Sequence, residues 1–527
     1  MIEPPINTDS LYSVDQIRNI ERHAMADLPP HALMKRAGEA AAHAAVELLT
    51  RNAGHRLPGP APVLIAAGPG NNGGDAFECG ACLARRGYSV TVLVPMRTDC
   101  LSPDTTEAMA HARACAVVFA DLHALAALAS QHWALVIDGL FGIGLTRPLT
   151  GIWRDVVDTL NAIGAPLLAL DVPSGLNADT GMVAGDDEGA CISATHTLSF
   201  IGNKPGLHTG SGSDFAGTVS VASLDIDARL YPTPLARLNQ RAAFGATHHG
   251  RRKNSHKGSF GDVLVVGGSV GMTGAAILAA HAALKAGSGR VLIGFADPAQ
   301  VPGSVAGHPE VMCRHAAELD FNGATLVVGP GLGSSTQARE LVARACASAP
   351  RLVLDADGLN LVAADPALQL QVTARGARSA VTLLTPHPLE AARLLGVAVD
   401  DVQRNRLGAT QDIATKYRAT VVLKGAGSVI ACHNADDVLR INITGNPALA
   451  TGGTGDVLAG ICGALLAQGW EVHDAACAAV WAHGAAADRL VASGVGPIGV
   501  TASEVIDAAR SILNDLVAGR VRPNDQQ

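Results

Sequence analysis

Residues 62–86 read PVLIAAGPGNNGGDAFECGACLARR and combine three patterns in one segment. The apolar run 63–66 is typical of a buried strand, and residues 76–86 are typical of a helix. Between them, the glycine-rich turn 68–75 would leave backbone N–H groups bare at the start of that helix, where they can bind phosphate. A strand, a glycine-rich turn and a helix in this order predict an α/β unit with a phosphate-binding turn.

A second glycine-rich turn, TGGTGD, occupies residues 451–456 near the other end of the chain. It precedes the apolar helical run 457–461 and ends in Asp456, just as the first turn ends in Asp75. Each carboxylate would lie where a bound ligand lies. Two such turns in two domain-sized halves predict two sites that act on phosphate-bearing ligands.

The composition indicates two α/β domains. The chain has 527 residues, of which 48% are apolar and 3% aromatic, with 58 Gly. This length exceeds one ordinary core, and small residues let helices pack closely on a sheet. The net charge of −8 argues against a general nucleic-acid surface. Residues 1–5 lack a signal-peptide pattern, and no apolar run reaches the ~20 residues of a membrane helix, so we expect a cytoplasmic protein.

The ten cysteines are scattered, apart from a C-x-x-C pair formed by Cys79 and Cys82. Such a pair can be redox-active or can supply half of a zinc site. No second close Cys/His pair is placed to complete tetrahedral zinc, and the pair falls on the helix after the first glycine-rich turn. We therefore expect both cysteines to be buried helix residues.

Strand and helix patterns alternate along both halves of the chain. After a helical region at 10–50, the first half has apolar strand patterns at 63–66, 89–94, 135–138 and 167–171. The second half has them at 263–266, 291–293, 325–328, 352–355, 381–384 and 420–423. Buried strands that alternate with helices predict parallel sheets with helices on both faces, a three-layer α/β/α arrangement. We expect a first domain at 1–235, a polar linker at 236–253 and a second domain at 254–520.

The spacing Gly68-x-Gly70-x-x-Gly73 matches the dinucleotide fingerprint, which alone is weak evidence. That fingerprint also needs an acidic residue at the end of the next strand to hold a ribose. The chain reads VPMR at 94–97, without an acid. An ordinary NAD-dependent dehydrogenase is therefore disfavoured, and the chain has no GK[ST] phosphate-binding loop either.

Three oxygen-bearing side chains, those of Asn72, Asp138 and Ser174, come at the ends of strands in the first half. Any one of them alone is more simply a helix cap or a turn residue. Because the carboxyl ends of parallel strands meet at one edge of a sheet, we expect the three to lie close together. Together they can surround a hard monovalent or divalent cation.

The set GPGNNGGD at 68–75, D-x-x-FG-x-G at 138–144 and D-x-PSGL at 171–176 resembles the NAD(P)H-hydrate epimerases. This resemblance spans roughly residues 10–235. It implies a Rossmann-like domain in which Asp171 contacts the hydrated nicotinamide ring. Because interconversion of the R and S hydrates needs a proton shuttle near C6, Asp171 is also the best-placed acid–base residue.

The same resemblance implies ligands for a cation and for the nucleotide. The implied potassium ligands are Asn72, Asp138 and Ser174. The implied nucleotide-binding residues are Asn71, Asn72, Gly73, Gly74, Asp75, Gly142, Ile143, Gly144, Leu145, Thr146, Arg147 and Pro148. Ala76 stands where the family usually has glycine, so we expect a tighter turn and a slightly altered pocket. Relatives of this fold also act as noncatalytic scaffolds, and retention of Asp138, Asp171 and Ser174 argues against that alternative.

The glycines of the second turn, at 452, 453 and 455, would expose N–H groups that stabilise a transferring phosphoryl group. Asp456 can accept the proton of a hydroxyl group that attacks a terminal phosphate. The alternative is a plain turn in which Asp456 caps the helix. Polar residues at the ends of the preceding strands favour the catalytic interpretation.

In this α/β setting the G-T-G-D run resembles the ribokinase-like superfamily and, within it, the ADP-dependent NAD(P)H-hydrate dehydratases. The resemblance spans roughly residues 250–515. The motifs that carry it are HKG at 256–258, GSVGMTGA at 268–275, GPGLG at 329–333, DAD at 355–357, TPHP at 385–388 and KG at 424–425. Leu389 replaces a glycine of the family, which puts the backbone shape of that loop in question.

The resemblance to the dehydratases also implies roles for individual residues. The residues implied to face the hydrate are Ala275, Gly331 and His387, with Asp456 at its hydroxyl group. Those implied to face AMP or ADP are Lys424, Gly425, Ala426, Gly427, Ser428 and Gly455. His387 depends mainly on this resemblance, because a lone histidine after a strand is usually a packed or solvent-facing residue.

Together the two resemblances imply a bifunctional repair enzyme for hydrated NADH and NADPH. The first domain would interconvert the R and S hydrates with K⁺. The second would dehydrate the S hydrate with ADP and Mg²⁺, giving AMP and phosphate. The main alternative is a ribokinase-like small-molecule kinase with a regulatory N-terminal domain. We expect small-molecule substrates and a homo-oligomer, with no nucleic-acid or membrane partner.

Overall fold

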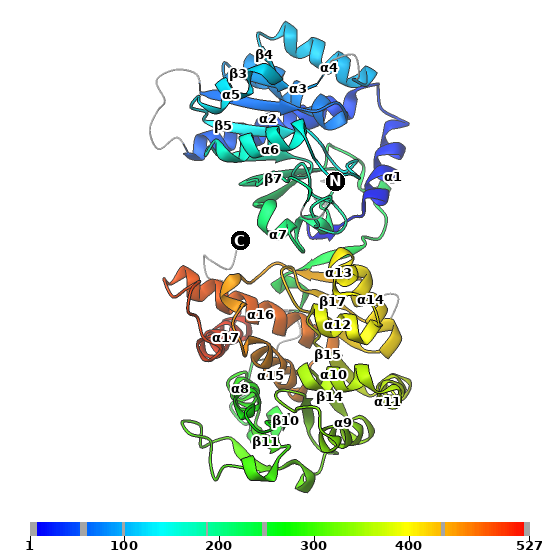
Figure 1. Cartoon of the computed structure of the whole chain (residues 1–527), viewed down its shortest axis with the longest axis vertical. Helices are drawn as coiled ribbons and strands as arrows, with labels where there is room; N and C mark the ends of the chain where they lie inside the picture. The colour runs from blue at the N-terminus through cyan, green and yellow to red at the C-terminus, as the bar shows by residue number, and fades with distance from the viewer. Residues whose placement is uncertain are drawn as a thin grey trace. The chain divides into compact units, whose positions relative to one another are not determined.

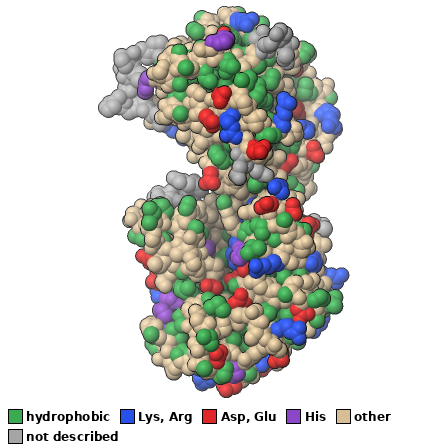
Figure 2. Space-filling view, viewed as in Figure 1, with side chains coloured by type: hydrophobic (Ala, Val, Ile, Leu, Met, Phe, Trp, Pro, Cys, Tyr) green, Lys and Arg blue, Asp and Glu red, His purple; other side chains and the backbone are tan. Residues whose placement is uncertain are grey.

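The structure is a computed structural model that describes residues 8–52, 61–96, 101–185, 188–244, 250–433 and 438–520. It divides into two compact units, Met1–Arg237 and Leu238–Gln527. Each unit contains a sheet with helices packed on it (Figure 1). In the face that Figure 2 presents, the described acidic and basic side chains are interspersed. None of the described helices is both long and apolar enough to cross a membrane.

The first unit is built on a parallel sheet in the order β4-β3-β2-β5-β6-β7-β8. Its strands are β2 (Pro62–Ala67), β3 (Ser89–Val94), β4 (Val118–Asp121), β5 (Leu135–Gly139), β6 (Leu167–Leu170), β7 (His196–Phe200) and β8 (Thr218–Ala222). Because β2 pairs with β3 on one side and β5 on the other, the connections diverge and open a crevice at its carboxyl end.

Helices cover both faces of this sheet. Val63 and Ile65 of β2 pack in one apolar cluster with α2 and α3, whereas Leu64 and Ala66 pack in another with α6. This two-sided burial explains the unbroken apolar run and confirms the predicted three layers. The helices are α1 (Val14–Met25), α2 (Ala32–Asn52), α3 (Asn71–Arg85), α4 (Pro103–Ala114), α5 (Leu125–Ala129), α6 (Ile152–Ala162) and α7 (Gly212–Phe215).

The second unit has a mixed sheet in the order β9-β18-β17-β16-β15-β14-β13-β10-β11-β12. Neighbours from β16 to β12 are parallel, and β17 pairs antiparallel with β16 and β18. The strands are β9 (Ala236–Asn239), β10 (Asp262–Gly267), β11 (Arg290–Phe295), β12 (Met312–His315), β13 (Thr325–Val328), β14 (Arg351–Leu354), β15 (Val381–Leu384), β16 (Thr420–Leu423), β17 (Val429–Ala431) and β18 (Leu439–Asn442). In the first unit, the short β1 (Ser10–Leu11) pairs with Ala236 and Arg237.

The central strands of the second unit are also buried on both faces. Val263 and Leu264, adjacent residues of β10, are 0% and 2% exposed. Val263 packs in one apolar cluster with Val457 and Ile461 of α15. The helices are α8 (Thr273–Lys285), α9 (Thr336–Ser348), α10 (Ala356–Ala364), α11 (Pro366–Ala377), α12 (Pro388–Leu395), α13 (Val399–Arg404), α14 (Arg406–Tyr417), α15 (Thr454–Ala467), α16 (Val472–Ala492) and α17 (Ala502–Val517).

The strands predicted from apolar runs are all present, within two residues of the expected bounds. The helical region predicted at 10–50 is instead β1, α1 and α2, with a break between Met25 and Ala32. Pro29 and Pro30 explain this break, because proline lacks the N–H group and disfavours a helical residue before it. Cys79 and Cys82 are buried on α3, as predicted.

The segment predicted as a polar linker contains ordered core residues. In β9, the Asn239 amide donates to Asn442 Oδ1 at 2.9 Å. Phe244 is 1% exposed, and its ring centroid lies 5.7 Å from that of Trp481. These contacts join the start of the predicted linker to the second unit. The basic residues around this segment made it look like a solvated linker in the sequence. Residues 245–249 lie outside the described part of the chain.

The Phe244→Ala substitution should destabilise the second unit, because it removes a buried ring from the core shared with Trp481. We expect the free energy of unfolding to fall by about 3–5 kcal/mol, measured by chemical denaturation. Leu370→Ala serves as the control, because that side chain is 72% exposed. A Phe244→Ala variant as stable as the control would contradict a core role for this segment.

Candidate active sites

A cavity of about 450 Å³ lies in the first unit at the carboxyl ends of β2, β5 and β6, beside α1 and α2. Many of the residues predicted to contact ligands line it. They are Asn71, Asn72, Asp75, Gly142, Ile143, Gly144, Leu145 and Asp171. Gly73 and Gly74 are buried in the first turn of α3, and Thr146, Arg147 and Pro148 continue the loop beyond the lining residues.

Glycine is required at two positions of these loops, because other atoms lie too close to leave room for a side chain. A Cβ added at Gly73 would lie 1.9 Å from the carbonyl oxygen of Gly68, so the turn closes only without a side chain. A Cβ at Gly142 would lie 2.8 Å from Asp171 Oδ2. The loop after β5 is therefore packed directly against the carboxylate of Asp171.

Ala76 lies inside α3, after the residues of the glycine-rich turn. The Ala76 side chain is buried and faces Gly139, where an added Cβ would lie 2.4 Å from Ala76 Cβ. Gly139 thus supplies the space that this alanine needs beside the sheet.

Two of the three predicted cation ligands are directly hydrogen-bonded. Asp138 is fully buried, and its Oδ1 accepts from Ser174 Oγ at 2.7 Å while its Oδ2 accepts from the Ser174 N–H at 2.8 Å. Burial raises the pKa of Asp138 to about 6, although these hydrogen bonds favour its ionised form. Asn72 is 7% exposed, and neither its amide nitrogen nor its amide oxygen has a hydrogen-bond partner among the described residues. Such an unpaired buried amide is costly without a ligand.

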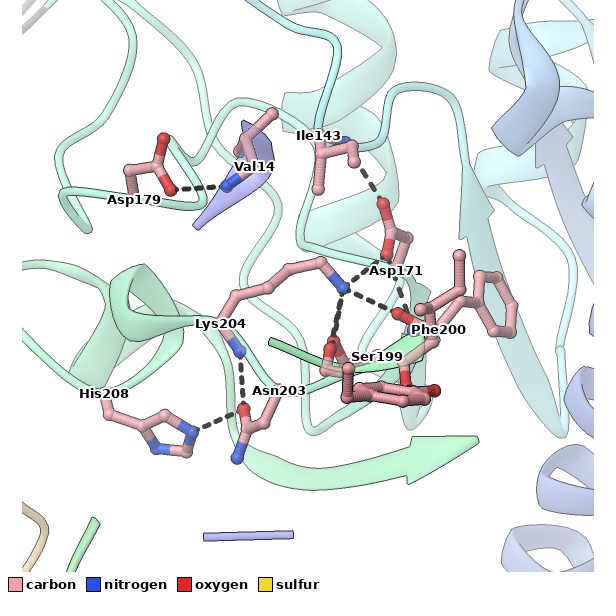
Figure 3. A network of polar contacts seen from close by, with 12 residues as sticks. Val14, Ile143, Asp171, Asp179, Ser199, Phe200, Asn203, Lys204 and His208 are labelled. Atoms are coloured by element: carbon pink, nitrogen blue, oxygen red, sulfur yellow. Dashed lines mark hydrogen bonds and ion pairs between the residues drawn. The ribbon is translucent and has the colours of Figure 1, made fainter. Parts of the chain in front are cut away.

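Asp171 follows β6 and is held from two sides (Figure 3). Its Oδ2 accepts from the Ile143 N–H at 3.1 Å, and its Oδ1 lies 2.8 Å from Lys204 Nζ. Its φ of 67° lies in the left-handed region, which costs energy for a residue with a side chain. The fold therefore keeps Asp171 in a strained position at the wall of the cavity.

Three further carboxyl groups line the same cavity, those of Glu21 on α1, Asp75 on α3 and Asp104 on α4. Burial, reinforced by the charge of Asp171, raises the pKa of Glu21. Burial together with Asp171 and Glu21 raises the pKa of Asp75 well above its usual range. The cavity thus brings Asp171 close to carboxyl groups whose pKa values are raised.

In the second unit, Asp456 lies in the first turn of α15. The N-cap of this helix is Gly453, whose φ of 93° lies in the left-handed region. Asp456 does not accept a capping hydrogen bond as the N-cap residue, because Gly453 occupies that position. Burial, to which the charge of Asp355 adds, raises the pKa of Asp456 to about 7. The carboxyl group is therefore poised to exchange a proton near neutral pH.

Lys424 supplies the positive charge of this second site. Its Nζ donates to Asp355 Oδ1 at 2.7 Å and lies 3.9 Å from Glu390 Oε2. Burial opposes the charge of Lys424, but the Asp355 and Glu390 carboxyls outweigh it and raise the pKa. A Cβ added at Gly455 would lie 3.4 Å from Lys424 Nζ, so the ammonium group lies beside the glycine-rich turn.

His387 caps α12 instead of standing free after its strand. Its Nδ1 accepts from the N–H groups of Leu389 and Glu390 at 3.2 and 3.3 Å, and its Nε2 lies 3.2 Å from Glu390 Oε1. Burial, with Lys424 nearby, lowers the pKa of His387. Leu389 forms part of this capping turn, so the family glycine is not needed for the turn to form.

The remaining predicted residues of the second unit fall into two groups. A Cβ added at Gly331 would lie 3.2 Å from Ala275 Cβ, so these two predicted hydrate-facing residues are neighbours. Residues 425–428 connect β16 to β17, and Ser428 Oγ donates to the Gly425 carbonyl at 3.0 Å. Among the described residues, no group of three or more His, Cys, Asp or Glu side chains could hold a metal ion.

Two buried cations at these sites were missed by the sequence analysis. Lys204 is 0% exposed and contacts Asp171. Arg406 is 2% exposed, and its guanidinium donates to the Lys424 carbonyl at 3.2 Å. Lys204 could have been noticed because it closely follows a strand, at the edge where Asp138 and Asp171 lie. Arg406 lies on a helix, and no local pattern distinguishes it from a surface arginine.

Two family models match the chain. One, described as YjeF-related protein N-terminus, matches residues 30–206, and the other, described as NAD(P)H-hydrate dehydratase, matches residues 263–510. The bifunctional NAD(P)H-hydrate repair enzyme of Coxiella burnetii is 35% identical over 96% of this chain and 99% of its own length. The chain belongs to the family of bifunctional NAD(P)H-hydrate repair enzymes. Both resemblances read from the motifs are thereby confirmed.

Other members and neighbours of this repair-enzyme family match as well. The bifunctional NAD(P)H-hydrate repair enzyme of Escherichia coli is 35% identical over 97% of this chain and 95% of its own. Among solved structures, an ADP/ATP-dependent NAD(P)H-hydrate dehydratase from Bacillus subtilis, co-crystallised with ATP/Mg²⁺, is 28% identical with a TM-score of 0.46. That match covers 53% of this chain and 99% of the other.

Proposed function

We propose that this chain repairs hydrated NADH and NADPH in two steps. The first unit interconverts the R and S hydrates, and the second returns the S hydrate to NAD(P)H at the expense of ADP, giving AMP and phosphate. The observation that carries the proposal is Asp456, a partly buried carboxyl group at the start of α15 near Lys424, in a member of this family.

In the second unit, Asp456 takes the proton of the 6-hydroxyl group while the hydroxyl oxygen attacks the terminal phosphorus of ADP. The bond from that phosphorus to AMP breaks, and the hydrate then carries a phosphate ester at C6. The C6–O bond breaks next, with loss of phosphate and of a proton from C5, which restores the dihydronicotinamide. Phosphorylation of the hydroxyl group promotes the elimination because phosphate is a far better leaving group than hydroxide.

The residues around Asp456 suit the charge changes of this transfer. Backbone N–H groups of the turn 452–455, at the start of α15, can stabilise negative charge on the transferring phosphoryl group. Lys424 adds a positive charge beside the same turn. Mg²⁺, when bound to the nucleotide phosphates, would neutralise their charge and would be held largely by phosphate and water oxygens.

In the first unit, Asp171 is the proposed proton carrier for epimerisation. It lines the cavity together with the predicted nucleotide-binding residues, so a hydrate bound there would present its nicotinamide ring to this carboxylate. The partly buried Glu21 and Asp75 line the same cavity, and burial raises the pKa of each. Interconversion at C6 needs one group that accepts a proton and one that returns it.

K⁺ fits the group formed by Asn72, Asp138 and Ser174. The amide of Asn72 is buried and has no hydrogen-bond partner in the part of the chain that the structure describes. A carboxylate, an amide oxygen and a hydroxyl oxygen are all hard ligands. These residues would hold the ion, and the ion would supply positive charge close to the nucleotide site. A cytoplasmic location and a homo-oligomeric state remain predictions.

The Asp456→Asn substitution should abolish dehydration and leave epimerisation intact, because only the proton acceptor of the second unit is lost. With a mixed R/S preparation of hydrated NADH, ADP and Mg²⁺, the wild type should restore the absorbance of NADH from both epimers. The variant should be slower by about 10²–10⁴-fold. A stable phosphorylated product instead of NADH would favour the alternative of a small-molecule kinase.

Dehydration should weaken as the pH falls through neutrality. The pKa of Asp456, raised to about 7 by burial, leaves the carboxyl group protonated at lower pH, where it cannot accept a proton. We expect kcat/KM to fall about tenfold per pH unit below that value. The pH profile is measured with the S hydrate alone and saturating ADP. A rate that does not change between about pH 5 and 8 would contradict Asp456 as the base.

The Asn72→Ala substitution should weaken the dependence of epimerisation on K⁺. The Asn72 amide group makes no side-chain hydrogen bond to any described residue, so its loss removes a potential ligand without breaking such a bond. Addition of KCl should raise the melting temperature of the wild type more than NaCl does, and this difference should shrink in the variant. Equal responses to both salts in the wild type would contradict a specific potassium site.

A further inference from the structure

Lys204 is a fully buried ammonium group with an unusually complete set of partners. Its Nζ lies 2.8 Å from Asp171 Oδ1 and donates to Ser199 Oγ at 2.6 Å and to the carbonyl oxygens of Phe200 and Gly202 at 3.0 and 3.1 Å. Its side chain is 0% exposed. Figure 3 shows the ammonium group pointing at Asp171, Ser199 and Phe200.

All of the hydrogen-bond partners described around Lys204 Nζ are acceptors, so the amine acts only as a donor. Ser199 Oγ donates its own proton to the Gly202 carbonyl at 2.8 Å, so it can only accept from Lys204. The other two uncharged partners are carbonyl oxygens, which also only accept. A buried amine surrounded by acceptors is stabilised as the charged ammonium, because a neutral amine would leave acceptors unpaired.

The contacts of Asp171 show how each of its carboxylate oxygens is held. Its Oδ1 faces the ammonium of Lys204, and its Oδ2 accepts from the Ile143 N–H. Both oxygens therefore act as acceptors, which is the arrangement of an ionised carboxylate. Oδ2 is also the oxygen nearest to Gly142, a residue that lines the cavity.

Charged side chains from other elements surround Asp171. Glu21 on α1 and Asp75 on α3 line the same cavity and carry negative charge when ionised. Lys204, which follows β7, is the cation in direct contact with Asp171. Neighbouring carboxylates repel one another, and an opposite charge at salt-bridge distance offsets that repulsion.

We propose that Lys204 is a positioning residue for the epimerase reaction, which holds Asp171 as a carboxylate with Oδ2 directed to the substrate cavity. This inference rests on the proposed epimerase function of the first unit. Lys204 acts only through Asp171 and does not itself touch the substrate. Its backbone is fixed in turn by Asn203, whose Oδ1 accepts from the Lys204 N–H at 2.9 Å and contacts His208 Nε2 at 2.8 Å.

The test compares Lys204→Met with the wild-type full chain. R-hydrate conversion is followed with ADP and Mg²⁺ present, and conversion of the S hydrate by the second unit reports that the chain is intact. We expect R conversion to fall at least about tenfold at pH 7, and the acidic limb of its pH profile to move up by roughly 1–3 pH units. Lys35→Met is the matched control, because Lys35 is exposed and lies outside the cavity lining.

A double-variant comparison separates action through Asp171 from a general effect. In an Asp171→Asn background, Lys204→Met should cause no further loss of R conversion, because the carboxylate on which it acts is gone. Additive losses would overturn the proposal. A loss of rate with an unchanged pH profile in the single variant would also overturn it, since that pattern indicates packing alone.

Stability of the variants completes the test. Lys204→Gln keeps hydrogen-bond donors without the charge, and it should show the same shift of the pH profile as Lys204→Met. If both variants lose the thermal transition of the first unit, Lys204 is a residue of the fold and the proposal is wrong. Failure of the wild type to convert the R hydrate would instead contradict the proposed epimerase function, a separate result.

Discussion

Parallel strand pairing between layers of helices is the constraint on which both sites depend. Strands buried on both faces must run in the same direction when helices connect them, so their carboxyl ends meet at one edge of each sheet. In the first unit this brings Asp138, Asp171 and the turn before α3 to one edge. In the second it does the same for Asp355 and Lys424. The sheet topology therefore brings the residues of each candidate site together at one edge of the sheet.

Both sites share a second physical feature, which is one buried ammonium group among several carboxyls. Lys204 contacts Asp171 while Glu21 and Asp75 lie at the same cavity. Lys424 contacts Asp355, with Glu390 and Asp456 close enough to raise its pKa. Burial, together with the charge of neighbouring carboxylates, raises the pKa of Glu21 and Asp75 in the first unit and brings those of Glu390 and Asp456 in the second to about 7.

The parts of the fold that were predicted from sequence are those with strong local signals. Strand β2 is a continuous apolar run because both of its faces are covered, and that short run followed by a glycine-rich turn identified it as a strand. Strands β4, β8 and β12 were missed because they lie at or near sheet edges and are partly exposed, which dilutes the apolar pattern. β9 was missed because a basic segment surrounds it, and its burial depends on partners such as Asn442 that are distant in sequence.

The sequence alone determined the α/β class, the two glycine-rich helix starts and the family, because each is encoded in contiguous runs such as 68–75 and 451–456. It also predicted Asp171 and Asp456 as the main acid–base residues by motif. Only the tertiary structure decided which side chains contact those residues. Lys204 lies 33 positions from Asp171 in the numbering, and an ion pair across that separation leaves no local pattern. Burial and electrostatics depend on distance in space, and that distance is set by the folded chain.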